Sequence, residues 1–385
     1  TVMDEIAFGL ENRRVPVATI LERIEWALQV VQAESLRDRA LASLSGGEKQ
    51  KVAIAAMLAT QPRILIFDEP TSNLDPSATS AIFDVLDRIR RDTGITIIVI
   101  EHKLAFLRSF NPRLVRLQRG QVTCDRARIP QEHDLSLAVP RSPGEVVISL
   151  EHLSYAYGSG GRALDDVSLH LRAGHLIALM GDNGSGKSTF LRCVMGLLQP
   201  LAGRVLVLGQ DLHRGQVSAL ARQAGFLFQN PDCQLLANSV REEAVLLARN
   251  LGILPQVQDR ANKLLEQSGL GDQLDHHPFR LSYGEKRRLN MVAVTAHAPR
   301  IVLADEILIG QDPDNAAQVM RHLRAMADSG ACVVLALHDS SVALRFADRI
   351  LFLEAGRLTV DGPPLAALRA IVARGYGGYG VEHVT

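Results

Sequence analysis

Short apolar runs, separated by turns and polar segments, dominate the hydrophobic pattern of this chain. Five of them have the length of a buried strand and are too short for a helix. A helical segment, residues 189–198, follows the second run, and polar helical stretches separate the others. Apolar strands alternating with helices are typical of an α/β fold with a parallel sheet. The five predicted strands are residues 95–100, 175–180, 224–228, 300–304 and 331–337.

Residues 126–145 interrupt this pattern. They include Pro130, Pro140, Pro143 and Gly144 among polar residues and show no sustained periodicity. Such a stretch is typical of a linker. We therefore predict one domain over residues 1–125 and a second over residues 146–385.

One motif carries specific chemistry. Residues 181–188 (GDNGSGKS) fit the phosphate-binding pattern G-x-x-x-x-G-K-[ST], between a predicted strand and a predicted helix. Glycines let backbone N–H groups approach phosphates, and the helix N-terminus adds its positive dipole end. Lys187 would reach the β- and γ-phosphates, and the Ser188 hydroxyl would bind Mg²⁺. The residues expected to contact ATP here are Gly181, Asn183, Gly184, Ser185, Gly186, Lys187, Ser188 and Thr189.

Three further strand ends carry candidate catalytic groups. The strand 300–304 ends in Asp305-Glu306; Asp305 is the expected Mg²⁺ partner of the loop, and Glu306 could orient and deprotonate the attacking water. The alternative is that both carboxylates cap the next turn. Gln229 could touch Mg²⁺ or water, or be a surface residue. His338 follows the predicted strand 331–337, and a lone histidine in such a position is usually structural.

The two predicted domains share a sequence repeat. Residues 44–49 (LSGGEK) recur 237 positions later as residues 281–286 (LSYGEK), and Asp68-Glu69 recurs at the same offset as Asp305-Glu306. Two homologous units therefore lie in tandem. At this offset the counterparts of the phosphate loop and of Gln229 would precede Thr1, so we expect the first unit to lack about ninety residues here. We also expect it to fold poorly alone, since loss of a buried strand exposes apolar surface.

Composition limits the possible partners. The chain has 42 Lys+Arg, 42 Asp+Glu and 47% hydrophobic residues, which excludes a disordered chain and argues against nucleic acid as the main partner. No apolar run reaches the roughly 18–20 residues that span a bilayer, so a role at a membrane would need a partner. The four cysteines are far apart, which favours free thiols in a reducing cytosol over disulfides or a zinc site.

These motifs resemble the ATPase subunit of ABC transporters: LSGGE before a helix, a strand ending in Asp-Glu, then an Asp and a His. Residues 228–232 (FQNPD), 1–12 and 309–312 (IGQD) resemble more narrowly the tandem ATPases of energy-coupling factor (ECF) importers, which take up vitamins and transition-metal ions. The resemblance implies two tandem P-loop ATPase domains, each with a parallel-sheet core and a helical subdomain. The first would be incomplete.

The resemblance also assigns roles. Two units of this family stack head to tail, and each ATP lies between the phosphate loop of one unit and the LSGGE element of the other. This implies intramolecular pairing of the two halves. By residue, it implies catalytic Glu306, His338 and Gln229, a Mg²⁺ site of Ser188, Asp305 and Gln229, adenine stacking on Tyr157 (or Tyr155), and contacts to ATP from Ser45, Gly46, Gly47 and Glu48.

A second ATP site would use the other copy of the signature, where Tyr283 replaces a glycine. A phosphate must approach the backbone closely there. We expect that site to be catalytically weaker.

The implied function is ATP hydrolysis, with ATP and Mg²⁺ as cofactors, driving a membrane importer of a vitamin, vitamin precursor or metal ion. The partners would be integral membrane subunits, one a transmembrane coupling protein and one a substrate-capture protein, and not nucleic acid. The ATPase would lie peripherally on the cytoplasmic face of the plasma membrane. Two alternatives stand: a soluble ABC ATPase acting on ribosomes or DNA, and a non-catalytic fragment. The short linker, without heptads or a charge run, argues against the first.

Two surface features stay open. In the family, residues 231–252 form the groove where a helix of the membrane protein docks, yet their apolar side chains could equally belong to the local core. The basic run Lys286-Arg287-Arg288 is interpreted as a solvated helix face. The apolar residues concerned are Leu235, Leu236, Val240 and Leu247.

Overall fold

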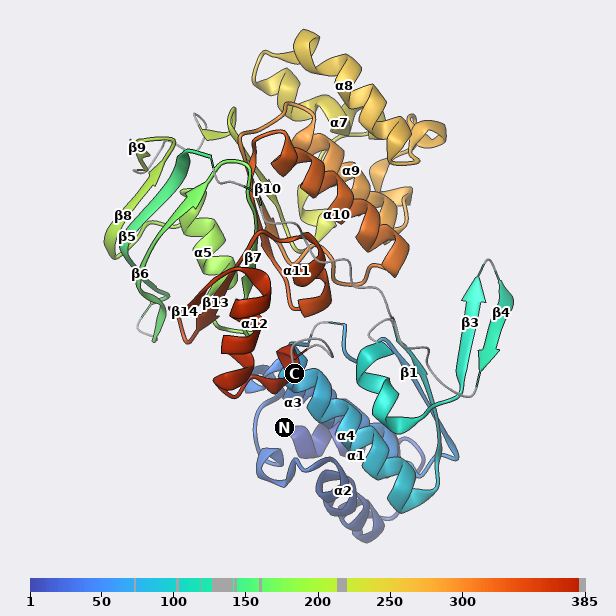
Figure 1. Cartoon of the computed structure of the whole chain (residues 1–385). Helices are drawn as coiled ribbons and strands as arrows, with labels where there is room; N and C mark the ends of the chain where they lie inside the picture. Colours follow the sequence, from blue (N-terminus) through green and yellow to red (C-terminus); the bar gives the residue numbers. More distant parts are fainter. Residues whose placement is uncertain are drawn as a thin grey trace. The chain divides into compact units, whose positions relative to one another are not determined.

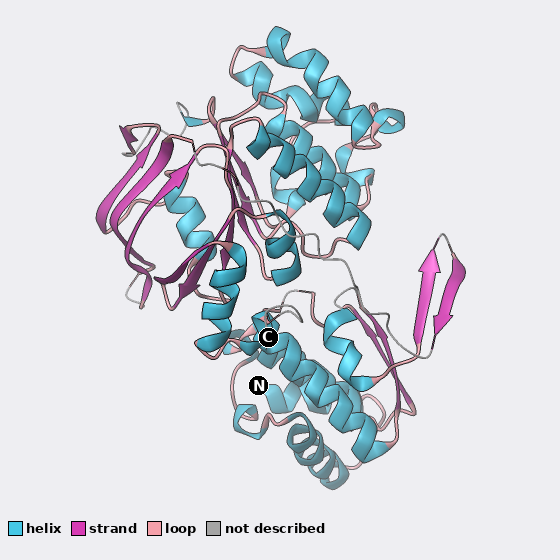
Figure 2. Cartoon of the chain, viewed as in Figure 1, coloured by secondary structure: helices cyan, strands magenta, loops and turns pink. Residues whose placement is uncertain are grey.

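The computed structural model describes residues 1–72, 74–101, 104–118, 120–126, 141, 144–158, 161–212 and 220–380. The chain divides into two compact units, Thr1–His133 and Asp134–Thr385, each described here by itself. Both combine helices and strands (Figures 1 and 2), so the predicted α/β class is confirmed. Most of the predicted linker lies outside the described residues, and its bounds stay a prediction.

In the described part of the first unit, four helices pack on one face of a small parallel sheet, in which β1 pairs with β2 and Ile66 lies opposite Ile98. An antiparallel hairpin, β3–β4, follows. The elements are α1 (Val2–Glu11), α2 (Val17–Val31), α3 (Gly46–Ala59), β1 (Ile64–Asp68), α4 (Pro76–Thr93), β2 (Thr96–Ile100), β3 (Leu114–Gln118) and β4 (Gln121–Arg126), with short 3₁₀ turns at Glu34–Leu36, Leu41–Ser43 and Leu104–Phe110.

One face of the β1–β2 sheet is covered and the other is bare. Leu65 and Phe67 pack into the core formed by α1–α4. The alternate side chains are at least 47% exposed, because successive residues of a strand point to opposite faces. This apolar sheet face, hereafter the bare face, consists of Ile64, Ile66, Ile98 and Ile100.

The second unit contains two sheets and a helical subdomain. Its strands are β5 (Val146–Ala156), β6 (Arg162–Arg172), β7 (Leu176–Met180), β8 (Ala202–Val207), β9 (Gln210–Asp211), β10 (Ala224–Leu227), β11 (Ile301–Asp305), β12 (Cys332–Ala336), β13 (Arg349–Glu354) and β14 (Arg357–Gly362). Its helices are α5 (Lys187–Val194), α7 (Val240–Asn250), α8 (Leu254–Gln267), α9 (Tyr283–Thr295), α10 (Pro313–Asp328), α11 (Ser340–Phe346) and α12 (Pro364–Ala373), with short 3₁₀ turns at Pro231–Gln234, Gly271–Gln273, Pro278–Arg280 and Gly377–Tyr379.

The main sheet of this unit has the order β10-β11-β12-β7-β13-β14. All its neighbours are parallel except β13 and β14. On one face, α5 packs in a core shared with the antiparallel sheet β6-β5-β8-β9. On the other face lie α10, α11 and α12, while α7, α8 and α9 form a separate helical core (Figure 1).

All five predicted strands exist, within one residue at each end, as β2, β7, β10, β11 and β12. The predicted helix 189–198 is α5, which ends earlier, at Val194. Gly196 follows with a φ of +73°, a left-handed conformation that stops a helix. Neither the antiparallel sheet nor the antiparallel strand β14 was predicted, because apolar-run length indicates a strand but not its direction.

Candidate functional site

The phosphate loop joins β7 to α5 through backbone that only glycine adopts easily. Gly181 has a φ of +144° and Gly186 a φ of +105°. A Cβ on Gly181 would lie 2.3 Å from the Leu353 carbonyl oxygen, and one on Gly186 would lie 2.3 Å from the Ala163 carbonyl oxygen. Both glycines are therefore required by close backbone approach as well as by conformation.

Lys187 begins α5 and is folded back over this loop. Its Nζ donates to the carbonyl oxygens of Gly181, at 2.8 Å, and Asp182, at 3.1 Å. It also lies 3.3 Å from Glu306 Oε1, with only 4% of its side chain exposed. The loop thus surrounds a buried positive charge.

The next residue reaches the neighbouring strand. The Ser188 hydroxyl donates to Asp305 Oδ1 at 3.0 Å. Asp305 ends β11, and its burial raises the pKa of the carboxyl above its ordinary value of 3.8, with the adjacent Glu306 charge adding to the rise. The hydroxyl and the carboxylate oxygens form a pair of hard oxygen donors.

Glu306 is the convergence point of the site. Its Oε1 lies 2.9 Å from His338 Nε2 as well as near Lys187, and its Oε2 accepts a 3.1 Å hydrogen bond from Gln229 Nε2. Its backbone has a φ of +49°, which is uncommon for a residue other than glycine. Its counterpart Glu69 has a φ of +45°, so the repeat preserves this conformation.

The charge of Glu306 is maintained against burial. Desolvation opposes ionisation, but the hydrogen bond from His338, followed by the charges of His338 and Lys187, together outweigh it. The pKa of Glu306 is therefore held below its ordinary value of 4.5. Glu306 is therefore ionised at neutral pH, which is the form that a general base requires.

Tyr157 follows β5 at the edge of the loop. It is half-exposed, and its hydroxyl lies 3.3 Å from Thr189 Oγ1. Tyr155 packs edge-on against it, with ring centroids 4.9 Å apart, and is partly buried in the core. Tyr157 therefore offers the more accessible ring of the two.

The remaining loop residues line the same turn. Gly184 has a φ of +80°. Ser185 is buried, and its Oγ has no hydrogen-bond partner within the described ranges. Asn183 lies between Asp182 and Gly184 in the described loop. The loop thus combines close-packed glycines with an orphaned buried hydroxyl, as expected of a cradle for a phosphate group.

Mg²⁺ fits these residues. It prefers oxygen ligands and usually takes one or two carboxylates together with substrate phosphates. Ser188 and Asp305 supply such oxygens side by side, whereas Gln229 directs its amide nitrogen to Glu306. In the part of the chain that the structure describes, no cluster of three His, Cys, Asp or Glu side chains could hold a metal alone.

The four residues expected from the first unit gather at one helix start. Ser45 caps α3: its Oγ accepts from the Glu48 amide at 3.3 Å, and Glu48 Oε2 accepts from the Ser45 amide at 2.7 Å. Gly46 and Gly47 form the first turn. Ser45 and Gly46 are exposed. The Gly46 N–H can therefore approach a ligand, whereas the Ser45 N–H is held by Glu48.

The basic run of α9 is not a solvated face, and that interpretation was wrong. Arg287 is fully buried and donates to the carbonyl oxygens of Phe228, at 2.6 Å, and of Gln229. Arg288 donates to the Ser268 carbonyl oxygen at 2.8 Å. Sequence reasoning missed Arg287 because two of its three acceptors are backbone atoms, which leave no signal in the sequence.

A groove lies beside this region, with a volume of about 310 Å³. Leu236 and Leu247 line it, while Leu235 and Val240 belong to the helical core. Other apolar side chains of its wall are Met195, Leu197, Phe226, Phe228, Leu246 and Val294.

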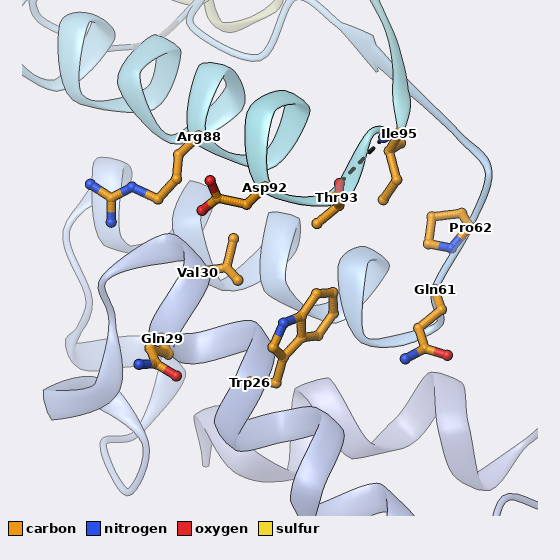
Figure 3. Close-up of a pocket in the computed structure, with 9 residues that line it drawn as sticks. All are labelled: Trp26, Gln29, Val30, Gln61, Pro62, Arg88, Asp92, Thr93 and Ile95. Carbon is orange, nitrogen blue, oxygen red and sulfur yellow. Dashed lines mark hydrogen bonds between the residues drawn. The ribbon is translucent and has the colours of Figure 1, made fainter.

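A second hollow, of about 760 Å³, lies in the first unit between α2, α4 and the start of β2 (Figure 3). It contains none of the predicted site residues. At the rim of this hollow, Thr93 Oγ1 accepts a hydrogen bond of 3.3 Å from the Ile95 amide. The residues drawn are Trp26, Gln29, Val30, Gln61, Pro62, Arg88, Asp92, Thr93 and Ile95.

Comparison with known proteins agrees with this geometry. The family described as ABC transporter matches residues 4–72 and 164–308, which is more than half of the chain. The chain belongs to the ABC transporter ATP-binding family. It is an ATPase subunit of this family, and its fold is that of an ABC ATPase.

Two curated relatives cover 94% of the chain. "Putative HMP/thiamine import ATP-binding protein YkoD" of Bacillus subtilis (strain 168) is 32% identical, and the match covers 74% of its length. "Putative ABC transporter ATP-binding protein" of Methanosarcina mazei is 31% identical, with 72% of its length covered.

Solved ATP-binding cassettes resemble part of the chain. CbiO1 from Clostridium perfringens, described as part of the ABC transporter complex cbiONQ, matches with a TM-score of 0.53 and 26% identity over 61% of this chain and 98% of its own. A dimeric cassette in a post-hydrolysis state bound to ADP and Pi matches with a TM-score of 0.51 and 25% identity, over 56% and 98%. Among the described helices of our ABC ATPase, none is both long and apolar enough to cross a membrane.

Proposed function

We propose that this ABC ATPase hydrolyses ATP at the Lys187–Glu306 centre to energise an ECF-type importer of a vitamin, vitamin precursor or metal ion. The observation that carries the proposal is the convergence of Lys187, His338 and Gln229 on the one carboxylate of Glu306. The relative named for HMP/thiamine import and the similarity to CbiO1 support the importer class.

Each side chain has a distinct task in hydrolysis. The loop and Lys187 bind the phosphates of ATP, and Tyr157 offers its ring to adenine. Glu306, ionised at neutral pH, orients a water and takes its proton as the water attacks the γ-phosphate. His338 and Gln229 hold the two oxygens of Glu306, which fixes the direction of the base. Ser188 and Asp305 would hold Mg²⁺, which neutralises phosphate charge when bound.

The first unit completes the site in this proposal. Gly46 and Gly47 present helix-start N–H groups and Ser45 its side chain, a combination that suits an anion. Since the repeat gives each half one such element, we propose that the α3 start meets the ATP held at Lys187. Transition-state charge would then be neutralised from both sides only when the halves close. The weaker site would involve the second signature, at Tyr283.

The groove lined by Leu236 and Leu247 is proposed as the docking surface for a helix of the membrane subunit. Leu236 is 78% exposed and Leu197 is 45% exposed, although both are large apolar side chains. Contiguous exposed apolar surface typically marks an interaction site. Docking there would place the ATPase peripherally on the cytoplasmic face of the plasma membrane. The docked helix would lie close to Gln229.

Assembly with membrane proteins tests this proposal. The full chain is extracted from its native membranes in mild detergent, and the integral proteins that co-purify are identified. Leu236→Asp should reduce their yield at least tenfold, because a charge in an apolar interface is costly. Leu201→Asp, at a residue 70% exposed outside the groove, is the matched control. Retention of the partners by Leu236→Asp would refute the groove as the docking surface, and co-purification of ribosomes or DNA instead would refute the importer function.

A further inference from the structure

One face of α9 holds the loop that carries Gln229. Lys286 Nζ lies 2.9 Å from Asp232 Oδ1, and Asn290 Nδ2 donates to the Pro231 carbonyl oxygen at 2.8 Å. Between them, Arg287 donates to the carbonyl oxygens of Phe228 and Gln229. Positions three and four apart share a helix face, so these contacts form a single strip along α9.

Arg287 is unusual within this strip because its charge is completely buried. Its acceptors in the described part of the chain are two backbone carbonyl oxygens and the Tyr283 hydroxyl, at 3.2 Å, and its Nε has no partner there. A buried guanidinium is costly unless its donors are satisfied. The loop backbone must therefore keep both carbonyl groups turned toward α9.

The held backbone belongs to the residue that contacts Glu306. The Gln229 carbonyl oxygen is bound by Arg287, and the Gln229 side chain donates to Glu306 Oε2. The Tyr283 hydroxyl also lies 3.5 Å from the Gln229 carbonyl oxygen. The Arg287 guanidinium carbon lies 5.7 Å from the centre of the Tyr283 ring, so ring and guanidinium support each other.

We propose that Arg287, braced by Tyr283, is a positioning residue for hydrolysis: by fixing the Gln229 backbone it aims the Gln229 amide at Glu306. The inference rests on the proposed function of the Glu306 centre. It also accounts for the substitution in the second signature. The repeat places Gly46 and Gln50 where the second unit has Tyr283 and Arg287, so both members of the pair differ together.

The test compares steady-state ATP hydrolysis by the full chain and its variants, with ATP affinity measured separately by a fluorescent ATP analogue. Arg287→Gln, which installs the residue of the first unit, should lower kcat about tenfold and leave ATP affinity within about twofold. Arg287→Lys should restore part of the loss. Adding Arg287→Gln to Gln229→Ala should cause no further loss, because the arginine acts through Gln229.

Arg288→Gln is the matched control, since it makes the same chemical change one position along the helix. It should leave kcat within about twofold, because Arg288 contacts Ser268 and Asn315 and not the loop. A milder variant, Tyr283→Phe, removes only the hydroxyl and should lower kcat about twofold to threefold. It keeps the test usable if Arg287→Gln folds poorly.

Three results would overturn the inference: an unchanged kcat in Arg287→Gln and Tyr283→Phe, a loss confined to ATP affinity, or losses that multiply in the Gln229→Ala double variant. Hydrogen exchange of residues 228–234 gives a readout that needs no activity, and Arg287→Gln should speed it about tenfold; unchanged exchange would also refute it. The proposed function itself fails separately, if the unmodified chain hydrolyses ATP no faster than Glu306→Gln.

Discussion

Glu306 stays ionised in a buried position because two neighbours, His338 and Lys187, favour its charged form. The motif predicted its identity and its nearness to the phosphate loop. The sequence could not show that Gln229, Lys187 and His338 would all meet on its two oxygens, because those contacts depend on the order of β10, β11 and β12 in the sheet. Arg287 was missed for a related reason, since two of its three acceptors are backbone carbonyl groups.

The depressed pKa of Glu306 predicts an acid-tolerant reaction. A base must be deprotonated, and a lowered pKa keeps it so as the pH falls. Hydrolysis at saturating ATP should therefore change by less than about twofold from about pH 7 to about pH 5.5, and be lost only below the ordinary range of a glutamate. A pH–rate profile measures this. Loss of activity with a midpoint near pH 6 would contradict it, provided that circular dichroism shows the fold intact.

The pKa of Asp305 is shifted in the opposite direction to that of Glu306, and this shift predicts how stability depends on pH. Burial raises its pKa, so the unfolded chain loses this proton first and stability falls as the pH rises from about 3.8 through the folded pKa. Asp305→Asn removes the buried charge and should raise the unfolding free energy of the second unit by about 1 kcal/mol at neutral pH. Denaturant unfolding measures this change. Asp211→Asn, at an exposed ion pair with Arg204, should not give that gain.

Two corresponding sheet elements differ in how they are covered. Strand β11 is buried throughout, whereas β1 alternates between buried and exposed residues. An apolar run predicted β11, whereas β1 was not among the five predicted strands, although both are short and rich in branched side chains. Their cover depends on what packs against each sheet, and in the second unit that includes α5 and the antiparallel sheet.

This difference predicts that truncation to alanine lowers the free energy of unfolding by unequal amounts in the two strands. Ile66 is 61% exposed and its counterpart Leu303 is fully buried. Leu303→Ala should cost roughly 2–5 kcal/mol of unfolding free energy, and Ile66→Ala less than about 0.5 kcal/mol. Chemical denaturation, monitored by hydrogen exchange, shows which unit loses stability in each variant. A large cost at Ile66 would show that the bare face is covered in solution.

At the scale of the whole molecule, the account divides labour between the halves. The chain has one phosphate loop, in the second unit, and an intact LSGGE element in the first. A Cβ on Gly46 would make only ordinary contact with Leu74, at 3.5 Å, so the fold should tolerate a larger residue there. Gly46→Leu should nonetheless lower hydrolysis at least about tenfold, because it blocks approach of a phosphate to the helix start.

The control for that variant is Thr60→Val, at the other end of the same helix. It should leave hydrolysis within about twofold. Normal turnover by Gly46→Leu would remove the first unit from the catalytic site, while leaving the Lys187–Glu306 centre itself untouched.

The most direct test of the central claim compares the two corresponding glutamates. Phosphate release is measured for the full chain, for Glu306→Gln and for Glu69→Gln, with ATP binding followed in parallel. Glu306→Gln should lose at least about a hundredfold in turnover while still binding ATP, because a general base typically contributes this much. Glu69→Gln should change turnover by less than about threefold, since Lys187 of the phosphate loop, His338 and Gln229 all contact Glu306. Equal losses in the two variants, or full activity in Glu306→Gln, would contradict the account.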